Sequence, residues 1–203
     1  MEPLSELARS STAAHSPGRY GSTIYPQAQH CHTGSGIASV EANPSKPSAL
    51  IMTVLMTPDM ANFSGNVHGG AILKILDQVA YSCASRYAGT YVVTLSVDRV
   101  IFRDTIHVGE LVTFSASVNY TGRTSMEIGI RIDTEDIREG TTRHTNSSYF
   151  TMVAVDGDNQ PVPVPPLIPT TPTMRQRYES ARLRRRAQRQ QFESPHACGH
   201  DVT

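Results

Sequence analysis

Apolar residues are concentrated between residues 49 and 155, and one stretch of them has a helical period. From residue 72 to residue 87 they recur at steps of three and four, which is typical of an amphipathic helix with a broad apolar face. The positions on that face are Ile72, Leu73, Leu76, Val79, Ala80, Cys83, Ala84 and Tyr87. Gly69 and Gly70 precede this segment and Gly89 follows it, so we predict one long helix between them.

Four later segments alternate between apolar and polar residues, as strands with one packed face do. We expect the packed faces to begin at Val93, Val112, Met126 and Tyr149 and to continue at every second residue. This assignment leaves Phe150, Met152 and Ala154 on the uncovered face, which favours self-association.

Three further segments complete the predicted pattern. Residues 49–56 form an apolar run that suits a buried strand. Residues 121–123 are typical of a hairpin loop, whereas residues 137–146 form a longer polar connection. The order is therefore one strand, one helix and four strands. Because the helix and the sheet must each bury an apolar surface, we predict an α+β fold in which an antiparallel sheet wraps around one central helix.

The predicted domain spans residues 49–158, and the rest of the chain differs in composition. Residues 1–48 are rich in small and polar residues and are expected to be disordered. Residues 159–173 form a proline-rich linker. Residues 174–203 form a basic tail that is either helical or disordered, and its arginines are expected to be solvated.

Charge and cysteine content exclude several classes of function. The net charge is zero, and no face of the predicted domain is strongly basic, so nucleic acid is not an expected partner. Three cysteines give no disulfide framework, which favours a reducing compartment. The chain has neither a secretory signal nor an apolar run long enough to span a membrane. We therefore expect a cytoplasmic protein, with a mitochondrial location as the alternative.

The segment that leads into the helix holds the candidate chemistry. Gly69 and Gly70 open the helix, and free backbone amides at a helix start can stabilise an oxyanion. Asp77 lies about two turns further on, and Asn62 lies just upstream. Each feature also has an ordinary interpretation on its own: a glycine turn, a solvent-facing acid and a loop asparagine.

Together with other motifs, these residues closely resemble the acyl-CoA thioesterase family with the hotdog fold. The first motif is G-N-V-H-G-G-x-I-L-K-x-x-D, which ends at Asp77. It is followed by A-x-R-Y-A-G, V-V-T-L-S-V-D, F-R-D-x-I-x-V-G-E and G-R-T-S-M-E-I. The resemblance covers residues 51–155 and implies hydrolysis of acyl-CoA thioesters by a curled sheet wrapped around one helix.

The resemblance also implies roles for individual residues. Asp77 is implied as the catalytic acid, either a general base for water or a nucleophile, and Asn62 as the group that positions water or the thioester. The amides of Gly69 and Gly70 are implied to polarise the carbonyl. The site lies between two hotdogs in this family, so Asn62 of one subunit faces Asp77 of another. The resemblance implies a homodimer as the minimum unit and, as is common in the family, a hexamer of three dimers.

CoA is implied to lie along the loop of Arg123, Thr124 and Ser125, where Arg123 meets a phosphate. Arg99 and His68 are further candidates for substrate contact, although His68 equally suits packing at the helix start. The resemblance implies no metal or redox cofactor. The histidines and cysteines near residues 30 and 198 match no closed metal site and are not expected to bind metal. The alternatives are a non-catalytic acyl-CoA-binding regulator on the same fold and a hotdog dehydratase, for which His68 is a poor match.

Overall fold

In the computed structural model, residues 46–98 and 100–193 are described. Most of the segment predicted to be disordered, residues 1–48, lies outside them, as do the last ten residues of the chain. The elements in chain order are β1 (Ala49–Leu55), η1 (Pro58–Met60), α1 (Gly69–Ala88), β2 (Val92–Val97), β3 (Leu111–Thr121), β4 (Ser125–Asp136), β5 (Thr141–Ala154) and α2 (Pro172–Glu193). Neither of the helices described is long and apolar enough to cross a membrane.

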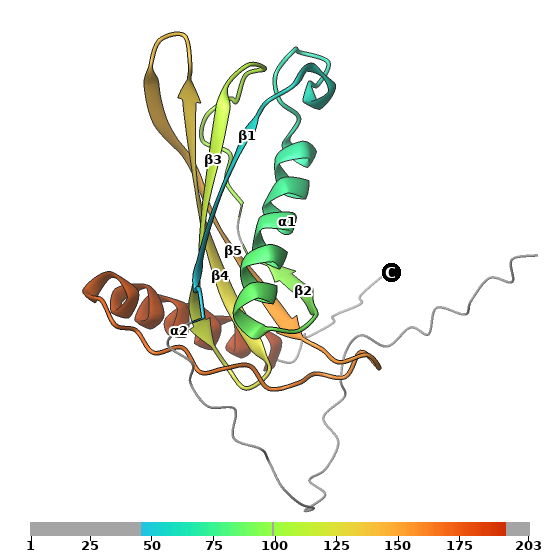
Figure 1. Ribbon diagram of the computed structural model, residues 1–203, viewed down its shortest axis with the longest axis vertical. Coiled ribbons are helices and arrows are strands. Elements are labelled where there is room, and N and C mark those ends of the chain that lie inside the picture. The colour runs from blue at the N-terminus through green and yellow to red at the C-terminus, as the bar shows by residue number, and fades with distance from the viewer. Residues whose placement is uncertain (1–45, 99, 194–203) are drawn as a thin grey trace, which may run out of the picture. The chain divides into compact units, whose positions relative to one another are not determined.

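The five strands form one antiparallel sheet in the order β1-β3-β4-β5-β2. Helix α1 lies along one face of this sheet (Figure 1). The predicted α+β arrangement, an antiparallel sheet with one central helix, is therefore confirmed. Strands β1 and β2 are the two edges, and β1 exposes Ile51 and Leu55 rather than being buried as predicted.

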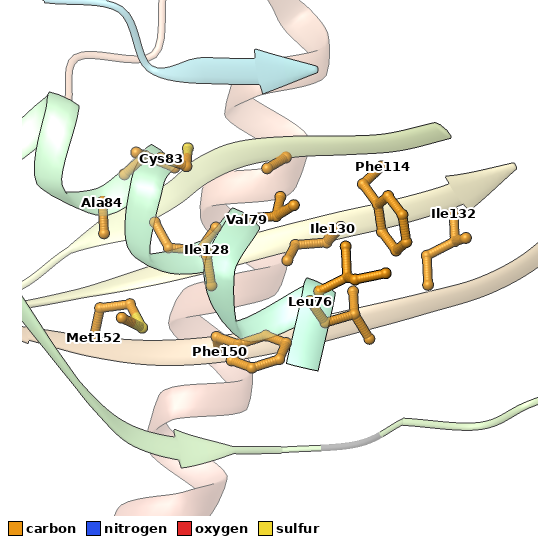
Figure 2. Close-up of a cluster of buried hydrophobic side chains, with 14 of the residues drawn as sticks. Leu76, Val79, Cys83, Ala84, Phe114, Ile128, Ile130, Ile132, Phe150 and Met152 are labelled. Atoms are coloured by element: carbon orange, nitrogen blue, oxygen red, sulfur yellow. The ribbon is translucent and has the colours of Figure 1, made fainter. Parts of the chain in front are cut away.

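The core lies between α1 and the sheet (Figure 2). The apolar stripe of the helix is buried almost as predicted, with Leu76, Val79 and Ala84 fully shielded from solvent, while Leu73 is partly exposed. The sheet contributes Phe114, Ile128, Ile130, Ile132, Phe150 and Met152. The prediction that Phe150, Met152 and Ala154 lie on the uncovered face is wrong, because they pack beneath the helix.

Two β-bulges explain further differences from the predicted strand faces. In β2 the register shifts between Thr94 and Ser96, and Thr94 pairs with the buried Met152. Since paired residues share a face, Thr94 points toward the helix side and Val93 does not. In β3 the shift between Val118 and Tyr120 turns Tyr120 to the opposite face. Each extra residue reverses the alternation beyond it.

Strands β4 and β5 are longer than the sequence predicts. The connection expected over residues 137–146 is only a short turn, since β5 already begins at Thr141. Gly140 in this turn has a φ of 65°, a value that glycine adopts without strain. Residues 137–142 are exposed, so the strand begins there without the apolar alternation that would mark it.

The basic tail was expected to be solvated, but helix α2 packs on the sheet face opposite α1. Ala181 is completely buried, and the rings of Tyr178 and Tyr120 lie 5.0 Å apart. The guanidinium of Arg184 lies 3.8 Å from the centre of the Tyr149 ring. The contacts come from arginines and tyrosines rather than from an apolar stripe, so hydrophobic periodicity does not mark them.

Candidate active site

The loop between η1 and α1 holds Asn62 in a tight turn. Its backbone N–H donates to the carbonyl of Asn66 at 2.6 Å. Its side-chain Oδ1 accepts from the amides of Ser64 at 2.9 Å and Asn66 at 3.1 Å. These two donors fix the orientation of the side-chain amide. Its Nδ2 group has no partner among the described residues and is therefore available to a ligand.

The start of α1 offers one free amide rather than the predicted two. His68 is the N-cap, and its Nδ1 accepts from the amide of Gly70 at 2.8 Å. The amide of Gly69 has no partner within the described part of the chain. Gly69 is therefore the donor left for a ligand, and the structure gives His68 a capping role.

A pocket of about 360 Å³ lies beside this helix start. Its lining includes Asn62, Asn66, Val67, Gly69, Ile72 and residues 102–106. A Cβ atom on Gly69 would lie 3.5 Å from the ring of Phe102, so the aromatic ring packs directly over the helix backbone. Asn62 and Gly69, two of the predicted site residues, therefore share one pocket wall.

Asp77 lies on the same helix, but it does not line this pocket. It is solvent-exposed, and its Oδ1 accepts a hydrogen bond of 2.6 Å from Thr94 Oγ1 on β2. Eight residues of helix separate it from Gly69, which is roughly 12 Å along the axis. A group held at the helix start of one chain is thus too far away for Asp77 of the same chain to reach.

Thr94, which donates to the candidate residue Asp77, is a candidate site residue that the sequence analysis missed. Its alternation with Val93 and Leu95 placed it on the solvent face of β2, and only the bulge reveals that it points toward Asp77. The cue in the sequence is weak, since a threonine in a strand is common.

The surface near Asp77 includes exposed apolar side chains and lies at an open sheet edge. Strand β2 pairs with β5 on one side and has no strand on the other among the described residues. Large side chains on or next to this edge remain exposed: Leu73, Tyr81, Tyr91, Leu95 and Val97. An unprotected edge with exposed apolar side chains is typical of an association surface.

The loop predicted to contact CoA is held by the C-terminal part of the chain. The amide of Val164 donates to the carbonyl of Arg123 at 2.9 Å. Ser125 is buried, and its Oγ accepts from Arg185 at 2.6 Å. Thr124 is half-buried, and its carbonyl accepts from the Ala154 amide. The Arg123 side chain is exposed and has no partner among the described residues, and Arg99 lies outside them.

No group of three or more potential metal ligands occurs within residues 46–193, leaving out residue 99. The histidine and cysteine motifs near both ends of the chain lie outside the described residues. Cys83 is buried, and burial raises the pKa of its thiol to about 11, with the charge of Arg86 opposing the shift. Its predicted place in the core is confirmed, and the thiol is not an activated nucleophile.

Comparison with known proteins adds sequence and structural relatives. A family model described as the thioesterase superfamily matches residues 64–141. Protein VdlD of Helicobacter pylori is 44% identical over 160 residues, which cover 79% of this chain and 90% of that protein. The crystal structure of an apo-hexameric acyl-CoA thioesterase superimposes with a TM-score of 0.72 at 34% identity, covering 76% of this chain and 99% of the other.

An acyl-CoA hydrolase from Staphylococcus aureus, solved with butyryl coenzyme A and coenzyme A, gives a TM-score of 0.65 at 30% identity over 71% of this chain and 90% of that one. Structures of three of its variants carry alanine in place of an asparagine, an aspartate and a threonine. The sequence intervals between those three positions equal the intervals between Asn62, Asp77 and Thr94 here.

Proposed function

The chain belongs to the acyl-CoA thioesterase family with the hotdog fold, and from this premise we propose that it hydrolyses acyl-CoA thioesters to a carboxylic acid and CoA. The observation that carries the mechanism is Asp77, an exposed carboxylate fixed by a 2.6 Å hydrogen bond from Thr94 beside an open sheet edge. The matching intervals in the Staphylococcus aureus hydrolase support these roles for Asn62, Asp77 and Thr94.

The complete site in this proposal needs two copies of the chain. A second copy would cover the apolar edge at β2, and a twofold axis would then place Asp77 of each copy near the pocket of the other. In this arrangement Asp77 does not need to reach the helix start of its own chain. Three such dimers would form an assembly like that of the hexameric relative.

The reaction we propose is direct attack by water. The thioester carbonyl oxygen would accept a hydrogen bond from the Gly69 amide, and the free Nδ2 of Asn62 would position the carbonyl or the water. Asp77 of the other copy, with Oδ1 already held by Thr94, would take a proton from the attacking water through Oδ2. The Gly69 amide stabilises the tetrahedral oxyanion. Collapse of the tetrahedral intermediate breaks the carbon–sulfur bond, and the proton held by Asp77 passes to the departing CoA thiolate.

Thiol release from short, medium, long and aromatic acyl-CoAs tests the activity. We expect Asp77→Ala to lower kcat by about 10³-fold or more, and Asn62→Ala to lower kcat more than it raises KM. Circular dichroism should show that both variants remain folded. An Asp77→Ala variant with wild-type kcat on every substrate contradicts the mechanism. Acyl-CoA binding without thiol release would instead identify a non-catalytic acyl-CoA-binding protein.

Mixing the two impaired variants tests the shared site. A heterodimer of Asn62→Ala and Asp77→Ala chains contains one site with both changes and one site with neither. After dissociation and reassembly, random pairing should therefore restore about a quarter of wild-type activity for twofold-symmetric dimers. If the mixture stays inactive although heterodimers form, Asn62 and Asp77 act within one chain or not together.

A further inference from the structure

A continuous set of hydrogen bonds connects strand β5 to Asn62. We infer that Arg143, Glu110 and His107 form a relay that positions Asn62 for the reaction. This inference rests on the proposed function, because it concerns how the site asparagine is held. The three residues touch no substrate in this scheme and act through Asn66, which we treat as the last member of the relay.

The first half of the relay is an ion pair between the buried carboxylate of Glu110 and the half-buried guanidinium of Arg143. Arg143 Nη1 donates to Glu110 Oε1 at 2.7 Å, and Arg143 Nη2 donates to Oε2 at 2.9 Å. This bidentate geometry fixes both side chains. Arg143 Nη2 also donates to the carbonyl of Thr105 at 2.8 Å, and Thr105 lines the pocket. The same guanidinium therefore anchors the pocket wall to the sheet.

The second half passes from Glu110 to the site loop. Glu110 Oε2 accepts from the backbone amide of His107 at 2.8 Å. His107 Nδ1 lies 2.9 Å from Asn66 Oδ1, and the backbones of these two residues form an isolated β-bridge. Asn66 in turn bonds to Asn62 through its amide and its carbonyl, at 3.1 Å and 2.6 Å.

Hydrogen bonds must position this turn because it has little apolar packing. Phe63 at its tip is fully exposed, and Ser64 and Gly65 are exposed as well. A displacement of about 1 Å at a reacting group can lower the rate by about 100-fold. A loosened relay should therefore lower turnover while acyl-CoA binding at other contacts persists.

The chain contains a closely matched control for the stability effect. The Arg184–Glu127 pair on the face covered by α2 has side-chain exposures of 29% and 7%, against 34% and 7% for Arg143 and Glu110. No hydrogen bond described in the structure joins Arg184 or Glu127 to the Asn62 loop. Replacing either arginine should destabilise the fold to a similar degree, whereas only the replacement of Arg143 should alter the site.

Kinetics of Arg143→Ala and Arg184→Ala on the wild-type and Asn62→Ala backgrounds test the inference. We expect Arg143→Ala to lower kcat by about 10- to 100-fold with KM changed by less than about threefold, and Arg184→Ala to leave kcat within about twofold. Arg143→Lys should restore part of the loss. On the Asn62→Ala background, Arg143→Ala should have almost no further effect on kcat. An equal loss on both backgrounds, or an equal loss of kcat in the Arg184 control, overturns the relay.

Amide hydrogen exchange tests the relay independently of the proposed reaction. If the wild-type protein releases no thiol, the proposed function fails, and amide exchange then tests the relay alone. We expect Arg143→Ala to speed exchange at the amides of Asn62 and Asn66 by at least about tenfold. We expect Arg184→Ala to change the exchange rates of these two amides no more than its effect on the free energy of global unfolding accounts for. Unchanged exchange in Arg143→Ala, or the same increase in the control, contradicts the relay.

Discussion

The clearest test of the fold concerns the ion pair that attaches α2 to the sheet. Arg184 donates to both carboxylate oxygens of Glu127, at 2.6 Å and 3.1 Å, and stacks on the Tyr149 ring. Arg184→Ala removes all of these contacts and leaves the carboxylate, whose side chain is only 7% exposed, without its cation.

The expected cost follows from the burial of the pair. Loss of one partner from a buried pair costs about 3–5 kcal/mol. Asn119 Nδ2 still donates to Glu127 at 3.2 Å, and Arg184 itself is 29% exposed. These two facts favour the lower end, about 3 kcal/mol. For a domain of this size, that corresponds to a fall in Tm of about 6–12 °C.

Urea unfolding followed by circular dichroism measures this cost, at one fixed protein concentration because association contributes to stability. Arg182→Ala is the matched control on the same helix. Arg182 pairs with Glu179 in solvent, with exposures of 47% and 55%, and its loss should change the free energy of unfolding by less than about 0.5 kcal/mol. A cost below about 1 kcal/mol for Arg184→Ala would mean that the tail is solvated, as the sequence alone indicated.

Three further predictions follow from single groups. Thr94→Val removes a charge-assisted hydrogen bond to Asp77 and should lower kcat by about 10- to 100-fold, whereas Thr94→Ser should retain most of the activity; an unchanged kcat in the valine variant refutes the role. Burial opposes ionisation of Glu110, but the hydrogen bonds and charges of Arg143 and His107 outweigh it and hold its pKa below the ordinary value. Because a lowered pKa stabilises the fold above the unfolded value of about 4.3 and the gain is lost as pH falls through the folded value, Glu110→Gln should show less acid destabilisation than wild type in urea unfolding between about pH 3 and 6. The Cys83 thiol, with its pKa raised to about 11 by burial, should react with Ellman's reagent at about pH 8 only after unfolding in a variant that lacks the other two cysteines; rapid labelling of the native protein contradicts this.

The sequence predicts the elements of the fold better than their faces. Helix α1 repeats its apolar period over about four turns, so both its ends and its buried side are evident. The faces of β2 and β3 depend on single bulge residues, which change the side of Thr94 and Tyr120 without changing the alternation in the sequence. The faces of β5 were misassigned because both carry apolar side chains, such as Phe150 and Val153.

Helix α2 shows where hydrophobic patterning cannot detect a packed element. Its contact face includes Tyr178, Ala181, Arg184 and Arg185. Arginine counts as polar in any hydropathy pattern, yet its planar group can cover a tyrosine ring and its charge can match a buried carboxylate. Glu127 is buried on β4 and needs a cation, but hydropathy gives no sign that the tail supplies it.

The candidate site shows a different limit, which comes from the geometry of one helix. Gly69 and Asp77 both lie on α1, and the rise of the helix keeps them roughly 12 Å apart along its axis. Two groups this far apart on one helix cannot contact the same carbon atom. Chemistry that uses both therefore needs a second copy of the helix that runs in the opposite direction. In the proposed dimer, a twofold axis beside β2 would supply that second helix. The exposed Leu95 and Val97, a liability for a lone chain, lie where such an axis requires contact. In this proposal, assembly and catalysis use the same sheet edge, and a complete site forms only between two copies of the chain.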